Sequence, residues 1–253
     1  MGVWGRRAVF YGGLLLIWYL VSAAGDVSQA AFPSPQAVGL RIFQGFADGE
    51  YLLAAAASLQ RILFGFGLAV VGGVLLGLAS SRFAWISDTA GPLMTGFQAL
   101  PSICWFPLVV LWMGPGEGTI LFVTVVGGVF AIASGVEAGV KSIPPLLLKA
   151  AENMGARNAT LYTRVILPAA LPAVIGGLRL GWSFGWRALM AGELLSVTPG
   201  LGRLLVAGRE QNNIAQVTAV VLLILLVGLA VDTLIFSRLE ANIRVRYGMV
   251  RSA

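Results

Sequence analysis

The chain contains six long apolar stretches, and each of them holds few charged side chains. A stretch of about 20 apolar residues is long enough to cross the hydrocarbon core of a membrane as a helix. The pattern therefore predicts an all-α, polytopic membrane protein that forms a single transmembrane domain over residues 1–253. The six predicted spans cover residues 8–24, 59–80, 89–113, 119–140, 166–190 and 216–236.

Prolines and glycines modify two of these spans. The third span contains Pro92, Pro101 and Pro107, which predict a broken helix. Broken helices at membrane depth persist only where they are buried in protein or line a cavity. In the second span, Gly73 and Gly77 are separated by three residues, a spacing that lets two membrane helices approach closely. We expect this pair to serve helix packing.

The connections between the spans also carry predictions. After Pro33-Ser34-Pro35, apolar residues recur at helical spacing up to residue 46, which predicts a short amphipathic helix along the outer surface. Residues 196–215 are predicted to form a loop. The first span would also suit a signal peptide, because small residues at 22–24 precede a cleavage point. We favour an uncleaved helix, since the run is about 17 residues long and further spans follow it.

Composition and charge agree with a membrane protein. Of 253 residues, 58% are hydrophobic and 11% are charged, and the mean hydropathy is +0.87. A soluble domain carries about a quarter charged residues. The net charge of +6 could indicate a nucleic-acid partner, but eleven of the 17 basic residues fall on one side of the predicted topology and three on the other. Cytoplasmic loops are rich in Lys and Arg, so we predict cytoplasmic termini and no nucleic acid.

Several kinds of chemistry are excluded by residue type. The chain has no His and a single Cys, which excludes an internal disulfide, His-based metal sites and His-based catalytic triads. The phosphate-binding pattern GxxxxGK[ST] is absent, because the two lysines, Lys141 and Lys149, do not follow a glycine. We therefore predict no catalytic residue, no metal and no cofactor on this chain. Energy for transport would come from a partner or from an ion gradient.

The segment 141–168 has a regular construction. Pro144-Pro145 suits the start of a helix, and Gly155 suits its end. A second helix is predicted over 158–166, immediately before Pro168. The sequence from Lys149 reads KAAENMG, followed by nine residues and then VILP.

This segment resembles the shared loop of the inner-membrane permease subunits of bacterial ABC importers, which reads E-A-A, three residues, G, nine residues and I-x-L-P. The chain matches at Ala150, Ala151, Gly155, Leu167 and Pro168, with Val165 in place of isoleucine. Lys149 stands where the family has glutamate, and Glu152 follows three residues later. In the family this loop forms a coupling helix that docks on the ATPase subunit. The resemblance therefore implies ATPase-coupling residues at Lys149, Ala150, Ala151, Glu152, Gly155, Leu167 and Pro168.

The resemblance extends over nearly the whole chain. Gly177-Leu178-Arg179, Trp186 and Glu193 are similar to the branch that serves nitrate, sulfonates and taurine, as are Ser58-Leu59-Gln60-Arg61 and Gly200-Leu201-Gly202. It implies a multi-pass permease of the bacterial inner membrane, in contact with lipid, that pairs with a second copy of itself. Its further partners would be two ATPase subunits, which bind ATP and Mg, and an extracytoplasmic solute-binding protein.

The solute itself stays open between two classes. An oxyanion such as a sulfonate, taurine or nitrate is favoured, and a neutral heterocycle such as a vitamin precursor is the alternative. A gradient-driven secondary transporter is a further alternative, but such proteins carry internal repeats, and none is evident across the six spans.

Polar residues of the fifth span are predicted to line the solute pathway. Offsets of seven and fourteen residues place three of them on one helical face, and the others fall on or beside that face. The set is Arg179, Ser183, Trp186, Arg187, Met190 and Glu193. Arg187 is the most informative, because a guanidinium suits a planar oxyanion through paired hydrogen bonds. Its alternative role is an ion pair with Glu193 or Glu137.

Structural roles are expected for other residues near these spans. Arg179 is expected to extend toward the interface or to pair with an acid, and Asp232 is expected to face Arg238. Trp182 and Trp186 are expected to be packing residues, with a role as gates of the pathway as the alternative. Cys104, between two prolines, is expected to be a small buried apolar residue.

Overall fold

The computed structural model describes residues 2–24 and 32–246, which form helices with no strand among them. Arg251, which contributes to the predicted cytoplasmic charge, lies outside the described residues. The α-helices are α1 (Val3–Ala23), α2 (Pro35–Ala47), α3 (Glu50–Arg82), α4 (Ala84–Ala99), α5 (Phe106–Met113), α6 (Glu117–Lys141), α7 (Pro145–Asn153), α8 (Asn158–Leu161), α9 (Leu167–Leu195), α10 (Leu201–Glu210), α11 (Ile214–Val231) and α12 (Ser237–Arg246). A 3-10 turn (Ser102–Trp105) precedes α5, and π-helical turns (Tyr162–Ile166 and Asp232–Phe236) precede α9 and α12.

Four continuous helical runs are long and apolar enough to cross a membrane: Glu50–Arg82, Glu117–Lys141, Asn158–Leu195 and Ile214–Ile243. A fifth span is formed if Ala84–Ala99 and Ser102–Met113, which meet at 99°, are taken together. The all-α, multi-span architecture is therefore confirmed. The predicted number of six spans is not confirmed, because α1, which covers the first predicted stretch, is not among these candidates.

The predicted break in the third span lies at Pro101. A residue before proline is driven away from helical backbone angles, and Leu100 accordingly has a ψ of 123°. The chain therefore leaves α4 at Ala99 and turns by 99° into the segment that holds the 3-10 turn and α5. Pro92, by contrast, lies within α4 and does not end it.

The chain forms two compact units, which are described separately: Met1–Ser58 with Thr198–Leu226, and Leu59–Val197 with Val227–Ala253. The core of the first unit contains Val38, Tyr51, Ala219 and Val220. The short helix predicted after Pro33-Ser34-Pro35 is present as α2, and Ser34 caps it by accepting a hydrogen bond from the Ala37 amide at 3.3 Å. The predicted loop over 196–215 is wrong in part, because it contains α10.

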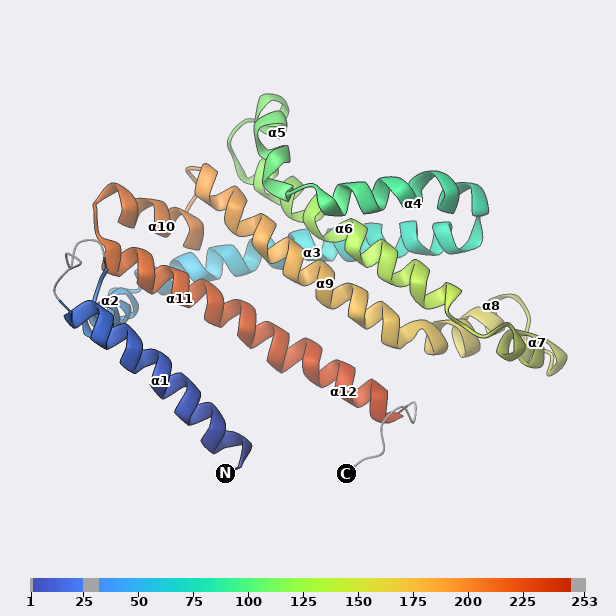
Figure 1. Cartoon of the computed structure of the whole chain (residues 1–253). Coiled ribbons are helices and arrows are strands. Elements are labelled where there is room, and N and C mark those ends of the chain that lie inside the picture. Colours follow the sequence, from blue (N-terminus) through green and yellow to red (C-terminus); the bar gives the residue numbers. More distant parts are fainter. Residues whose placement is uncertain (1, 25–31, 247–253) are drawn as a thin grey trace. The chain divides into compact units, whose positions relative to one another are not determined.

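In the second unit, α6 and α9 pack along one another, as Figure 1 shows. Glycines permit this approach: a Cβ on Gly177 would lie 2.8 Å from the Cα of Gly135. The predicted packing role of the Gly73 and Gly77 pair is confirmed as well. A Cβ on Gly73 would lie 2.7 Å from the Cβ of Ile132.

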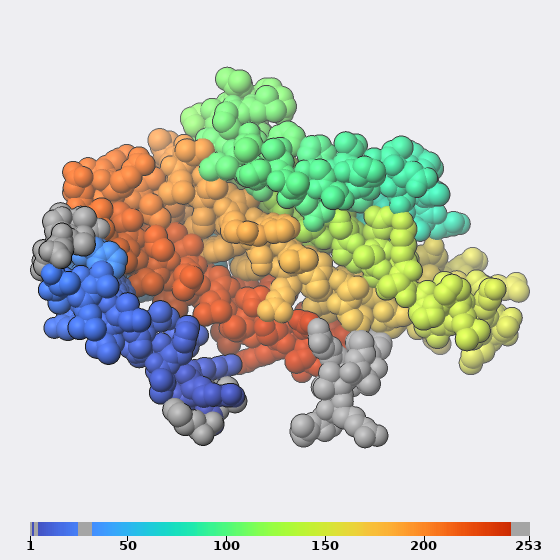
Figure 2. Space-filling view, in the orientation of Figure 1, coloured from blue at the N-terminus to red at the C-terminus, as the bar shows by residue number. Residues whose placement is uncertain are grey.

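The segment that follows α6 contains α7 and α8, which project beyond the ends of α6 and α9 (Figures 1 and 2). Helix α7 begins at Pro145 and ends before Gly155, whose φ of +89° suits glycine, so both predicted boundaries are confirmed. The predicted separate helix over 158–166 instead continues into α9. Pro168 lacks an amide hydrogen and crowds the carbonyl four residues earlier, which accounts for the π-helical turn that precedes it.

Candidate transport pocket and coupling segment

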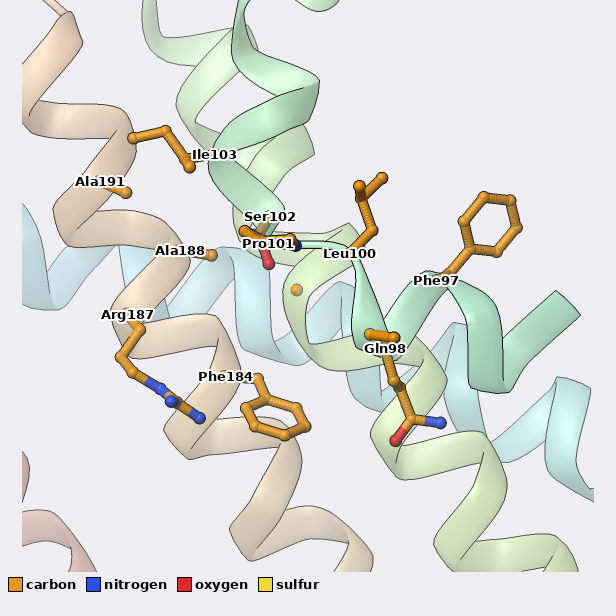
Figure 3. Close-up of a pocket in the computed structure, with 12 residues that line it drawn as sticks. Phe97, Gln98, Leu100, Pro101, Ser102, Ile103, Phe184, Arg187, Ala188 and Ala191 are labelled. Carbon is orange, nitrogen blue, oxygen red and sulfur yellow. The ribbon is translucent and has the colours of Figure 1, made fainter.

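A pocket of about 340 Å³ lies in the second unit, at the break between α4 and α5. One wall comes from the end of α4 and the 3-10 turn, and the other from α9 (Figure 3). The lining residues are Phe97, Gln98, Ala99, Leu100, Pro101, Ser102, Ile103, Gly127, Phe184, Arg187, Ala188 and Ala191.

Helical spacing explains the α9 wall. Arg187 and Ala188 follow Phe184 by three and four residues, and Ala191 follows them by four and three, so the set shares one face of the helix. Gly127 lets α6 and α9 come close, since a Cβ at this position would lie 2.7 Å from the Cβ of Ala188 on α9. The pocket thus lies where the chain leaves α4 before Pro101, beside the close approach of α6 and α9 at Gly127 and Ala188.

Arg187 is the charged residue of the pocket, and its side chain is exposed. Its Nε donates a hydrogen bond to the carbonyl oxygen of Ser183 at 3.1 Å. Its guanidinium carbon lies 4.7 Å from the centre of the Phe184 ring, a cation–π distance. Within residues 2–24 and 32–246, Arg187 forms no ion pair, and its two terminal amino groups donate to no protein acceptor.

The other two arginines within the predicted spans are neutralised. Arg61 donates to both carboxylate oxygens of Glu117 at 2.7 Å and to Glu193 at 2.6 Å. Arg179 donates to Asp232 at 2.6 and 2.7 Å and to Glu240 at 2.9 Å. Charged side chains within membrane helices are costly, are usually paired and mark functional sites. Arg187 forms no ion pair with the described residues, which distinguishes it from Arg61 and Arg179.

The coupling segment is a second candidate site, formed by α7 and the turn that follows it. In α7 no residue is buried. Apolar side chains are strongly exposed here, with Leu146 at 78% and Met154 at 88%. Lys149 and Glu152 are also exposed. An exposed apolar surface with charges beside it, on a helix that projects from the unit, is typical of a docking site for another protein.

Comparison with known proteins decides the family. Residues 69–244 match the family described as the binding-protein-dependent transport system inner membrane component. The chain belongs to this family. It is 33% identical to the taurine transport system permease protein of Escherichia coli over 236 residues, which cover 91% of this chain and 83% of that protein. It is 30% identical to the putative aliphatic sulfonates transport permease protein of E. coli over 220 residues, covering 87% and 84% of the two chains.

Among the six residues predicted to line the pathway of this permease, Arg187 alone lines the pocket. Trp186, Met190 and Glu193 are buried, and Glu193 is paired with Arg61. Ser183 is half-buried and donates to the Arg179 carbonyl at 3.1 Å. The predicted face thus points mainly into the protein, and the pocket uses the neighbouring face of α9.

The predicted structural alternatives of the permease have mixed outcomes. The ion pair of Arg187 with Glu193 or Glu137 is wrong, because Glu193 pairs with Arg61 and Glu137 pairs with Lys141 at 2.7 Å. Arg179 forms ion pairs, as one of its two expected roles requires.

Further corrections concern Asp232 and Cys104. Asp232 pairs with Arg179 and not with Arg238, because the two lie on packed helices. Cys104 is exposed, contrary to the expectation of burial, because the 3-10 turn lies at the surface of the described chain. Trp182 is a packing residue, since it stacks on Trp186 with ring centres 6.2 Å apart and contacts Phe66 and Phe236.

Sequence reasoning missed most of the pocket. Gln98, Ser102 and Phe184 line it but were not predicted to do so. The prolines at 101 and 107 were a usable signal, since a broken helix at membrane depth lines a cavity or is buried in protein. Nothing in the local sequence indicates that α9 forms the opposite wall.

Proposed function

We propose that this chain is the membrane permease of an ATP-driven importer for small organic sulfonates of the taurine type. The similarity to the taurine permease, which extends over 91% of this chain, carries the proposal. Arg187, which lies in a pocket at the helix break and forms no ion pair with the residues that the structure describes, supports an anionic solute over a neutral heterocycle.

In this proposal two copies of the permease associate with two ATPase subunits, and an extracytoplasmic binding protein delivers the solute. ATP and Mg bind to the ATPase subunits. The exposed surface of α7 docks on an ATPase subunit, so that closure of the ATPase pair moves the coupling segments and reopens the spans outward. Transport is then alternating access between two states.

The distribution of basic residues supports an orientation for the permease. Lys149, Arg157 and Arg164 lie in or beside the coupling segment, where positive charge favours the cytoplasm. Both termini are proposed to lie on the same side. Placement of the coupling segment in the cytoplasm is also what docking on a cytoplasmic ATPase requires.

Reconstitution tests the proposed function. The permease, co-expressed with the ATPase encoded beside it, is placed in liposomes with the neighbouring binding protein. We expect ATP hydrolysis to be stimulated by the binding protein loaded with taurine or an alkanesulfonate. Stimulation only by a neutral heterocycle would refute the solute class. Absence of an ATPase complex, or of any stimulation, would refute the importer.

A glycine substitution tests the coupling segment. Gly155 has a φ of +89°, which a β-branched residue adopts only with strain, and a Cβ there would meet open space. Gly155→Val should therefore disturb the turn after α7 and abolish stimulated ATP hydrolysis while membrane insertion persists. The matched control is Gly49→Val, since Gly49 has a φ of +76° and the same open space but lies outside the coupling segment. Equal activity of the two variants would contradict the role of α7.

A further inference from the structure

We infer that the pocket between the α4–α5 break and α9 is a transient binding site for the sulfonate group of the solute, with Arg187 as its charged ligand. The inference deepens the proposed function and rests on it. It assigns to one arginine a step that the family match leaves open, namely recognition of the anion inside the membrane after the binding protein has released it.

The hydrogen-bonding state of Arg187 supports an anion ligand. The Nε of Arg187 is occupied by the Ser183 carbonyl, which leaves the two terminal amino groups for a ligand. A guanidinium with free terminal donors matches the oxygens of a sulfonate through paired, charge-assisted hydrogen bonds. Arg61 cannot act in this way, because its Nε and both its terminal amino groups already donate to carboxylates.

The orientation of Arg187 is set before a ligand arrives. The Ser183 hydrogen bond lies on one turn of α9, and the Phe184 ring lies 4.7 Å from the guanidinium carbon. Figure 3 shows the Arg187 side chain extending beside Phe184 at the pocket. A side chain that is held in this manner loses little conformational entropy when it binds, so a small ligand gains more from each contact.

The remaining lining suits a small organic anion. Among the described residues that line the pocket, none is acidic, so an anion meets no repelling carboxylate. Ser102 supplies a hydroxyl group, while Phe97, Leu100 and Ile103 supply apolar surface for a short carbon chain. The volume of about 340 Å³ lies at the small end of the range for ligand pockets, roughly 300–1,000 Å³.

Cysteine labelling tests whether the pocket attracts a sulfonate. Native Cys104, which is exposed, is first replaced by Ser, and Ser102→Cys is then introduced as the reporter. The detergent-solubilised permease–ATPase complex is treated with either of two thiol reagents. One is 2-sulfonatoethyl methanethiosulfonate, an alkanesulfonate, and the other is its cationic 2-trimethylammonioethyl analogue. Detergent gives both reagents access from either side of the permease.

We expect the sulfonate reagent to react faster than the cationic one, and taurine to slow the reaction. Arg187→Gln should lower the ratio of the two rates on the order of tenfold, the low end of what local charge does to ion concentration in a cleft. The control is Arg82→Gln, since Arg82 is exposed at the end of α3 and does not line the pocket. An unchanged ratio in Arg187→Gln, or no protection by taurine, would overturn the inference. If Ser102→Cys does not assemble, Ala191→Cys provides the second reporter position.

Transport separates failure of this inference from failure of the proposed function. In liposomes, taurine uptake should fall at least about tenfold in Arg187→Gln and be partly retained in Arg187→Lys, because lysine keeps the charge but not the paired donors. Arg82→Gln should transport normally. If the wild-type complex takes up taurine and the Arg187→Gln complex takes it up at the same rate, the Arg187 site alone is overturned. A wild-type complex without stimulated hydrolysis or uptake overturns the importer itself.

Discussion

Gly177→Ala should destabilise the permease because α6 and α9 are in contact through their backbones at this position. The Cβ of an alanine at 177 would lie 2.8 Å from the Cα of Gly135, 3.4 Å from the carbonyl oxygen of Ile132 and 3.5 Å from that of Ala131. These are backbone atoms, so no side chain can rotate away. The two helices would have to separate.

The size of the effect follows from two opposing contributions. Adding a methyl group to a packed interior costs about 1–3 kcal/mol, and rigid backbone neighbours favour the upper part of this range. Alanine in place of glycine stabilises a helix by at most about 1 kcal/mol. We therefore expect Gly177→Ala to lower the free energy of unfolding by about 1–2 kcal/mol.

Gly176 provides the matched control on the same helix. A Cβ at this position meets no atom within 4 Å. Gly176→Ala therefore gains the helix propensity without overpacking, and we expect the free energy of unfolding to stay unchanged or to rise by up to about 1 kcal/mol. The two neighbouring substitutions, identical in chemistry, should differ by about 2 kcal/mol.

Denaturation in mixed micelles measures the difference. Unfolding is followed by the fluorescence of the seven tryptophans as sodium dodecyl sulfate is added, and two of them, Trp182 and Trp186, are buried on α9. Both variants must show the wild-type helical content by circular dichroism in native detergent. Equal stability of Gly177→Ala and Gly176→Ala would refute the backbone contact between α6 and α9.

Two ion-pair predictions use the same assay. Arg61→Gln should lower the free energy of unfolding by about 3–5 kcal/mol, because it removes the arginine that is paired with the fully buried Glu193. The control is Arg82→Gln, at an exposed arginine, which should change the free energy of unfolding by at most about 0.5 kcal/mol. Asp232→Asn should have a smaller effect than Arg61→Gln, since the pair with Arg179 is about one third exposed and solvent screening weakens such pairs. A loss for Asp232→Asn that equals or exceeds the loss for Arg61→Gln would contradict this ranking.

Local sequence signals predicted the elements that depend on the backbone nearby. Pro145 and Gly155 delimit α7 as expected, because proline suits the first turn of a helix and glycine accepts the positive φ that ends one. The long apolar stretches predicted the membrane helices for a similar reason, since length and hydropathy are properties of the stretch itself. Pro101 likewise predicted the break that forms one wall of the pocket.

Local sequence signals did not predict which charged side chains form ion pairs between helices. Arg61 lies 56 residues from Glu117 and 132 residues from Glu193, and no spacing in the sequence indicates that these three side chains meet. The expected partners of Asp232 and Arg187 were wrong for the same reason. Ion pairs between helices depend on the rotation of each helix about its axis, which packing at glycines such as Gly135 and Gly177 determines.

The sequence by itself thus determined that the chain is helical, that it enters the membrane and that α7 runs from Pro145 to just before Gly155, because each of these follows from a contiguous segment. Only the tertiary structure decided which of three arginines forms no ion pair with the described residues. Arg61, Arg179 and Arg187 look alike in the sequence, and the packing of α3, α6, α9 and the helical run that ends in α12 brings carboxylates to the first two. The third is left facing a pocket, since the faces of α9 that carry Arg187 and Glu193 point in different directions.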